Sequence, residues 1–295
     1  MQNLKETFSK RKKWHNNRSS TIFPCFPSEN TIHYLIFQDY WSWKSDIKSE
    51  HITCIVRAFN STEDSALRTL EFPINSHNCI NLNNEFKISH CKDENSILPT
   101  SFEIEIISTK NLGFPFPGLM LFCLNENTNE ITCVHSGGRR LNSNEKKVKQ
   151  HFTESNWLAI ENQKFTPFFH IFNDSQDDAL NSKSIIEVSI NISGKKKDTF
   201  TSCVKHNSKP FSSKIYYISD IFSKSILEKI KNQDFWIEVS LFSSTFHRMI
   251  VGNYDKELDF HYVTHSFGKI QSKDYIEPNQ LGDTTAFLPL MNALP

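Results

Sequence analysis

Ile36-Phe37-Gln38-Asp39 is repeated 135 positions further along the chain as Ile171-Phe172-Asn173-Asp174. Later blocks have counterparts in the same order: Phe102-Glu103-Ile104-Glu105-Ile106 matches Phe235-Trp236-Ile237-Glu238-Val239, and Val134-His135-Ser136 matches Thr264-His265-Ser266. The separation between matched blocks changes only from 135 to 130 residues. Self-similarity at a nearly constant period indicates tandem duplication, so we predict two copies of one folding unit.

Within each copy, apolar and polar residues alternate over short stretches. In Ser101–Ile106 every second residue is apolar, which is the period of a β-strand with one buried face. Six or seven such stretches in about a hundred residues are typical of an immunoglobulin-like or fibronectin-like sandwich. The predicted fold is therefore all-β, with two tandem immunoglobulin/fibronectin-like β-sandwich domains arising from an internal duplication. The Cys-Trp-Cys spacing of true immunoglobulin domains is missing, so this likeness concerns architecture.

The strand pattern divides the chain into five segments. They are an N-terminal arm (1–30), a first β-sandwich (31–138), a linker (139–164), a second β-sandwich (165–268) and a C-terminal tail (269–295). One helix is expected over 219–231, where isoleucines and a phenylalanine recur at near-helical spacing after a Ser-Asp start.

Composition limits the classes of partner. Lys plus Arg and Asp plus Glu both number 33, so the chain has no overall charge that would attract nucleic acid. No apolar stretch approaches the ~18 residues of a membrane-spanning helix, and the first 25 residues contain no secretory apolar region. We predict a soluble, cytoplasmic protein without a membrane span.

The seven cysteines do not match between the copies, since Cys54 aligns with Val188 and Cys133 with Val263. An odd, unmatched set is typical of reduced thiols rather than of a disulfide framework. Glycosylation triplets begin at four asparagines and would suit a secreted protein, although such triplets arise by chance in a chain rich in Asn, Ser and Thr. They are Asn17, Asn60, Asn173 and Asn191.

The common catalytic motifs are missing, including the nucleophile elbow, the phosphate-binding loop and the paired-histidine zinc helix. His261 and His265 have the spacing of a helical zinc motif, but on a strand they would stand roughly 13 Å apart. We therefore predict neither a cofactor nor a metal site. The matched pair His135 and His265 is interpreted as hydrogen-bonded histidines at a sandwich edge.

A residue kept in both copies usually serves the shared fold, so candidate functional residues lie where the copies differ. One polar cluster is specific to the second copy and consists of His247, Arg248 and Asn253. An arginine can form two parallel hydrogen bonds to a carboxylate or phosphate, and a histidine can transfer a proton. The alternative is an ordinary solvent-facing strand end.

Tryptophans supply a second set of candidates. Trp41 and Trp43 would share one face of an extended segment, either as an exposed stacking platform or as a buried pair closing the first sandwich. Trp157 and Arg139 lie in the expected linker, where they would line a groove between the domains.

The leading hypothesis is a non-catalytic binding or interaction protein. It would recognise a partner protein or a glycan through the inter-domain groove or the second-domain loops, using Trp41, Trp43, Arg139, Trp157, Arg248 and Asn253. One alternative is an enzyme that acts on a polar or anionic small molecule with His247, Arg248 and His265. Another is a structural assembly subunit whose sheet edges pair between chains. The sequence predicts neither the ligand nor the oligomeric state.

Overall fold

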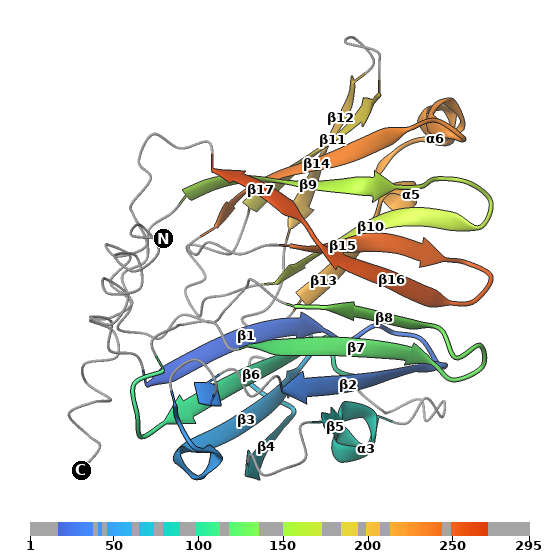
Figure 1. Ribbon diagram of the computed structural model, residues 1–295. Coiled ribbons are helices and arrows are strands. Elements are labelled where there is room, and N and C mark those ends of the chain that lie inside the picture. The colour runs from blue at the N-terminus through green and yellow to red at the C-terminus, as the bar shows by residue number, and fades with distance from the viewer. Residues whose placement is uncertain are drawn as a thin grey trace, which may run out of the picture.

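The computed structural model describes residues 17–37, 41–42, 46–60, 65–73, 79–88, 98–112, 118–135, 150–172, 184–193, 199–206, 213–243 and 249–270. These residues form four antiparallel sheets with a few short helices, which confirms the prediction of an all-β fold. We call residues 17–135 the first half and residues 150–270 the second half. In Figure 1 the sheets of the second half lie above those of the first.

The first half contains two four-stranded sheets. Sheet A has the order β1 (Arg18–Pro24), β6 (Ser101–Ser108), β3 (Ile52–Phe59) and β4 (Arg68–Pro73). Sheet B has the order β5 (Cys79–Asn81), β2 (Thr31–Phe37), β7 (Leu119–Asn125) and β8 (Ile131–Val134). Two short helical elements lie in the connections, η1 (Ser49–His51) and α3 (Leu82–Phe86).

The second half contains a five-stranded and a four-stranded sheet. Sheet C has the order β12 (Thr199–His206), β11 (Ser184–Ile192), β14 (Phe235–Ser243), β9 (Gln150–Ala159) and β17 (Phe267–Ile270). Sheet D has the order β13 (Ser213–Tyr217), β10 (Phe165–Phe172), β15 (Ile250–Asp255) and β16 (Phe260–His265). Two helices, α5 (Ile218–Ile221) and α6 (Lys224–Ile230), connect β13 to β14.

The two halves have the same strand order. Adding eight to each strand number of sheet A gives β9-β14-β11-β12, which is sheet C without β17, and the same operation converts sheet B into sheet D. In both halves the first and second strands lie in different sheets.

Matched turns join the last two strands of each half. Asn125 and Asp255 end β7 and β15, and the Oδ1 of each accepts hydrogen bonds of 3.0 to 3.2 Å from the backbone N–H groups two and three residues later. The residues four positions later, Asn129 and Asp259, are left-handed with φ of 60° and 49°. Asn and Asp suit both requirements, because they form such local hydrogen bonds and tolerate positive φ.

Strand register corrects one sequence match. When the strands are aligned on their pairing with the matched turn residues, Leu35 in β2 corresponds to Phe169 in β10. Both side chains are buried in the core of their half. Leu35 and Phe169 are 134 positions apart, whereas the sequence match pairs Ile36 with Ile171, which are 135 positions apart. The sequence match of these two strands is therefore shifted by one residue. Such a slip matters because successive strand residues face opposite sides of a sheet.

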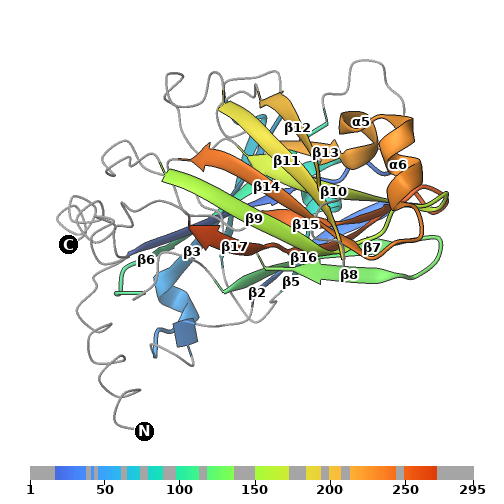
Figure 2. The ribbon, with the colours of Figure 1, turned by 90° about the horizontal axis from the view of Figure 1, so that it is seen from above.

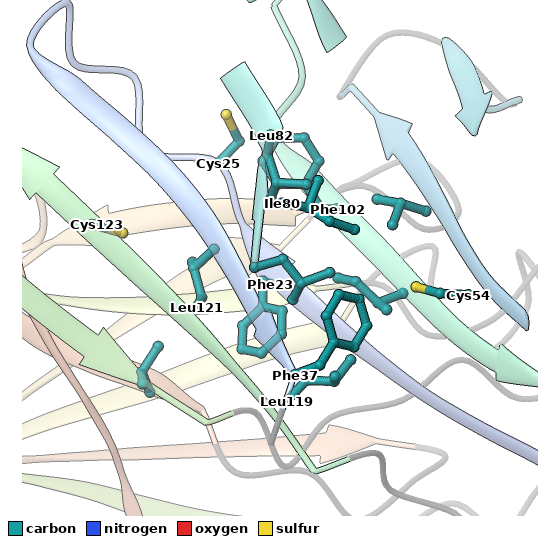
Figure 3. Packing of buried hydrophobic residues seen from close by; sticks show 14 of the residues in the cluster. Phe23, Cys25, Phe37, Cys54, Ile80, Leu82, Phe102, Leu119, Leu121 and Cys123 are labelled. Carbon is teal, nitrogen blue, oxygen red and sulfur yellow. The ribbon is translucent and has the colours of Figure 1, made fainter. Parts of the chain in front are cut away.

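Each half has a buried core between its two sheets. In the second half Ile186, Val188 and Ile190 of β11 pack with Phe169 and Ile171 of β10. In the first half, side chains of sheet A meet those of sheet B, as Figure 3 shows for a set of buried residues: Phe23, Cys54, Phe102, Phe37, Leu119 and Leu121.

Sheet D packs against the first half and contacts both of its sheets, sheet B through β8 and sheet A at Thr100, which precedes β6. Phe168 and Phe260 of sheet D belong to the same buried cluster as the first-half core. Across this interface the Val263 N–H donates to Thr132 Oγ1 at 2.9 Å. Seen from above in Figure 2, sheet C is the layer nearest the viewer. One face of sheet C therefore points away from the rest of the described molecule.

Two strands lie in segments that the sequence assigned elsewhere. β1 falls in the expected arm (1–30), and β9 occupies much of the expected linker (139–164). Their buried positions carry polar residues, including Ser20 in β1 and Glu154 in β9, so neither strand shows an apolar alternation.

The expected helix over 219–231 is instead split into α5 and α6. No helix among the described residues is long and apolar enough to cross a membrane. The six cysteines within the described residues are free thiols: Cys25, Cys54, Cys79, Cys123, Cys133 and Cys203.

Candidate functional site

Trp157 projects from an irregular point of β9. The pairing of β9 with β14 shifts between Phe235, opposite Ala159, and Ile237, opposite Asn156. Between these two pairs β9 contains one residue more than β14, which is the pattern of a β-bulge. Bulges redirect side chains locally, and here Trp157 has 64 % of its surface exposed.

Asn253 of β15 fastens this bulge to sheet D. Its Nδ2 donates to the Leu158 carbonyl at 2.6 Å, and its Oδ1 accepts from the Ile160 N–H at 2.9 Å. Asn156, on the bulge itself, donates to the Gly252 carbonyl at 3.2 Å and accepts from the Leu158 N–H at 3.2 Å. Asn253, predicted as a ligand-binding residue, thus binds the backbone beside Trp157.

Trp236 of β14 lies next to Trp157. The ring centroids are 6.3 Å apart and the ring planes are inclined by 19°. That separation lies within the range for aromatic pairs, and the rings are stacked. The Trp236 Nε1–H donates to Glu238 Oε1 at 3.2 Å, which orients the indole along the strand.

Polar residues continue this surface across the neighbouring strands. On β11 the side chains of Ile186, Val188 and Ile190 enter the core, so Ser189 and Asn191 point outward. Strand pairing forms two rows on this side of the sheet, Trp157–Trp236–Asn191–Thr199 and Ser155–Glu238–Ser189–Thr201, of which Ser155 is buried. We call these eight residues the tryptophan face.

Hydrogen bonds join neighbouring residues within the two rows. Thr199 Oγ1 donates to Asn191 Oδ1 at 3.0 Å, and the hydroxyls of Ser189 and Thr201 lie 3.0 Å apart. Cross-strand pairs of this kind contribute to sheet stability. The polar part of the tryptophan face is therefore ordered before any ligand arrives.

The corresponding face of sheet A is built differently. Glu103 occupies the place of Trp236, and Arg57 Nη1 contacts Glu103 Oε2 at 3.1 Å and Glu105 Oε2 at 2.6 Å. Arg18 also contacts both carboxylates. Burial alone would raise the pKa of Glu105, but the charges and hydrogen bonds of Arg18 and Arg57 outweigh it and lower that pKa. The first half thus uses this face for an internal ion-pair network.

The structure places Trp41 in the interior. It is 3 % exposed and packs edge-on against Phe37 at 6.3 Å between ring centroids. Of the two interpretations of Trp41, the buried one therefore applies, and it offers no stacking platform. Four other candidates lie outside the described residues: Trp43, Arg139, His247 and Arg248.

His265 lies against its matched partner. Its ring centroid is 4.6 Å from that of His135, and its Nδ1 is 2.9 Å from the Ser266 carbonyl oxygen. His261 is buried instead, with Nε2 2.7 Å from the Tyr217 hydroxyl. Within the described ranges, no group of three or more His, Cys, Asp or Glu residues could hold a metal ion.

The interface between the described parts of the two halves is packed with aromatic side chains. Phe26 stacks on His261 at 4.5 Å between ring centroids and meets Phe168 edge-on at 5.9 Å. Ser213 Oγ donates across the interface to the Thr100 carbonyl at 2.7 Å. These contacts join the halves and leave the tryptophan face as the better candidate.

A small hollow of about 350 Å³ lies at one end of sheet A. Its lining includes Asp46, Lys48, Glu50, His51 and Lys110. Charges of both signs line it, so it has no clear electrostatic preference for an anion or a cation.

The sequence pointed to Trp157 and Asn253 but not to Trp236. The signal for Trp236 was in the repeat itself, because Phe102-Glu103 in one copy corresponds to Phe235-Trp236 in the other. Comparison with protein-family models, curated proteins and solved structures found no match to this chain.

Proposed function

We propose that this protein is a non-catalytic binding protein that recognises a partner protein or a glycan, and that the tryptophan face is its binding surface. The observation that carries this proposal is the exposure of Trp157 beside Trp236 on the outward side of sheet C. Tryptophan is enriched among the residues that dominate binding energies.

Rigidity supports this assignment. A binding residue that is already held in place loses less conformational entropy when the ligand arrives. Trp157 lies on β9, which pairs with β14 on both sides of the bulge, and the bulge is fastened by Asn253. The adjacent Trp236 indole is oriented by Glu238.

We also infer that the two halves arose by internal duplication of one sandwich unit. The equal strand orders and the matched turns at Asn125 and Asp255 support this. The likeness to immunoglobulin domains is limited to the layered architecture. In immunoglobulin constant domains the first two strands share a sheet, whereas here β1 and β2 lie in different sheets. Under duplication, the tryptophan face is a feature that distinguishes the second half from the first.

Site-directed photo-crosslinking tests the proposed function. Benzoylphenylalanine is placed at Leu158, which is 70 % exposed and leaves both tryptophans intact, and at Ile131 of the first half, which is 62 % exposed, as the matched control. In an extract of the source cells, we expect adducts from position 158 that are absent from position 131.

Competition completes this test. Excess unlabelled wild-type protein should suppress the adducts, and a variant carrying both Trp157→Ala and Trp236→Ala should not. Equal adducts at both positions, or suppression by the double variant, would show that the tryptophan face is not the binding surface.

A further inference from the structure

We infer that the ligand of the tryptophan face is an uncharged glycan chain lying across the strands of sheet C. This inference rests on the proposed function and narrows it to one class of ligand. It is based on two nearly parallel indole rings that share one face of the sheet with neighbouring hydroxyl, amide and carboxylate groups.

The tryptophan pair suits the faces of sugar rings. A pyranose presents an apolar patch of C–H groups on its face and hydroxyls around its edge, so it stacks on an aromatic ring while its rim stays polar. The Trp157 and Trp236 planes are only 19° apart and their centroids 6.3 Å apart. Two nearly parallel indole rings on one face offer apolar ring surface to the sugar units of one chain.

The rest of the first row is polar and ends at the exposed Thr199. Trp157, Trp236, Asn191 and Thr199 follow one another across four adjacent strands. With roughly 4.8 Å between strands, this row spans roughly 14 Å, which is the length of a short oligosaccharide. A hydroxyl-rich ligand can donate hydrogen bonds to such side chains and accept hydrogen bonds from them, whereas an aliphatic protein surface can do neither.

The carboxylate beside the tryptophan pair disfavours an acidic group at that place. Glu238 adjoins the tryptophan pair and Glu187 lies one row further along β11, whereas Lys205 stands at the far edge on β12. A sulfated or carboxylated glycan over the tryptophan pair would meet the Glu238 carboxylate. An uncharged chain would instead find a hydrogen-bond acceptor there.

The experiment measures oligosaccharide binding directly. Full-length protein is titrated by calorimetry with uncharged gluco-, manno- and chito-oligosaccharides of increasing length, and with heparin fragments as the acidic contrast. Trp157→Ala and Trp236→Ala are compared with wild type, and Ile131→Ala, at an equally exposed apolar residue, is the matched control. Thermal melting shows that each variant is folded, and Trp157→Phe tests whether a smaller ring restores binding.

We expect an uncharged oligosaccharide to bind the wild type with an affinity that rises with length. Each tryptophan-to-alanine change should weaken it about tenfold or more, as for other ligands stacked on aromatic rings. Ile131→Ala should leave the affinity unchanged, and Trp157→Phe should retain most of it.

Three results would overturn the inference: no binding of any uncharged oligosaccharide, tighter binding of heparin fragments, or binding that both alanine variants retain. None of these decides the proposed function, which the crosslinking from Leu158 tests separately. Specific crosslinking there to a protein, without oligosaccharide binding, would retain the binding surface and refute the glycan.

Discussion

Asn253 links β15 of sheet D to β9 of sheet C through both ends of its side-chain amide. Polar residues with this role are easily mistaken for ligand-binding residues in a sequence, because both kinds differ between the copies. The difference lies in what the amide contacts, which here is the backbone of Leu158 and Ile160.

Asn253→Ala should therefore lower the stability of the protein. It removes two hydrogen bonds and leaves the Leu158 carbonyl and the Ile160 N–H without these partners, which should reduce the free energy of unfolding by about 1–3 kcal/mol. Urea denaturation measures this change, and Asn84→Ala, at an exposed residue of α3, is the control. Equal midpoints for wild type and Asn253→Ala would contradict the role given to this side chain.

At the scale of the element, β15 depends on a residue without a side chain. A Cβ atom at Gly252 would lie 1.8 Å from the Tyr262 carbonyl oxygen and 3.0 Å from a ring carbon of Phe168. An isolated glycine in a strand often marks such a close approach. The chain has only eight glycines, which makes this one informative.

Gly252→Ala should force β15 and β16 apart. Overpacking typically costs about 1–3 kcal/mol of unfolding free energy, and we expect a loss near the upper end of that range. Thermal and urea unfolding would show it, with Lys205→Ala at an exposed position of β12 as a strand substitution of small effect. A Gly252→Ala protein as stable as wild type would mean that the strands separate freely at this point.

Elements with apolar alternation could be predicted from the sequence, and the others could not. The strand expected from the alternation over Ser101–Ile106 corresponds to β6. β1 and β9 were not predicted, because buried Ser, Thr, Glu and Asn residues occupy positions that usually carry apolar side chains. The expected helix over 219–231 breaks because Phe222 adopts an extended backbone and packs in the core.

At the scale of the molecule, the two halves share an interface that contains a buried histidine. Burial, and the nearby His33, lower the pKa of His261 from 6.5 to about 3. Burial also lowers the pKa of His206, near the edge of the second-half core, to about 4. Both imidazoles are therefore neutral in the folded protein at neutral pH.

These shifts predict a loss of stability in mild acid. Below about pH 6.5 the unfolded chain takes up protons at both histidines while the folded chain does not, so the free energy of unfolding falls as pH falls. The loss should continue to about pH 4 for His206 and about pH 3 for His261, with a slope of up to about 1.4 kcal/mol per pH unit for each.

Urea unfolding as a function of pH measures this slope. His261→Phe keeps an aromatic ring against Phe26 but removes the titrating group, so its stability should fall less steeply below about pH 6.5. The Tyr217 hydroxyl loses a partner in that variant, which lowers its stability at every pH alike. An unchanged slope would show that His261 is not buried as a neutral group.

The binding surface required knowledge of the whole molecule. Trp157 was visible in the sequence as an unusual residue, but its neighbour Trp236 lies 79 positions away and meets it only through the pairing of β9 with β14. The inter-domain groove was a reasonable expectation for two separate sandwiches. The contacts of Phe26, Phe168 and His261 join the described parts of the two halves, and Arg139, which was expected to line the groove, lies outside the described residues.

The central claim is that ligand binds at Trp157 and Trp236, and nuclear magnetic resonance of the indole N–H groups tests it most directly. The chain has five tryptophans, so each signal can be assigned by a tryptophan-to-phenylalanine substitution. On titration with the oligosaccharide that binds in calorimetry, the signals of Trp157 and Trp236 should shift together and saturate, while that of Trp41, 3 % exposed, stays in place. Saturating shifts elsewhere, with the Trp157 and Trp236 signals unmoved, would contradict the claim.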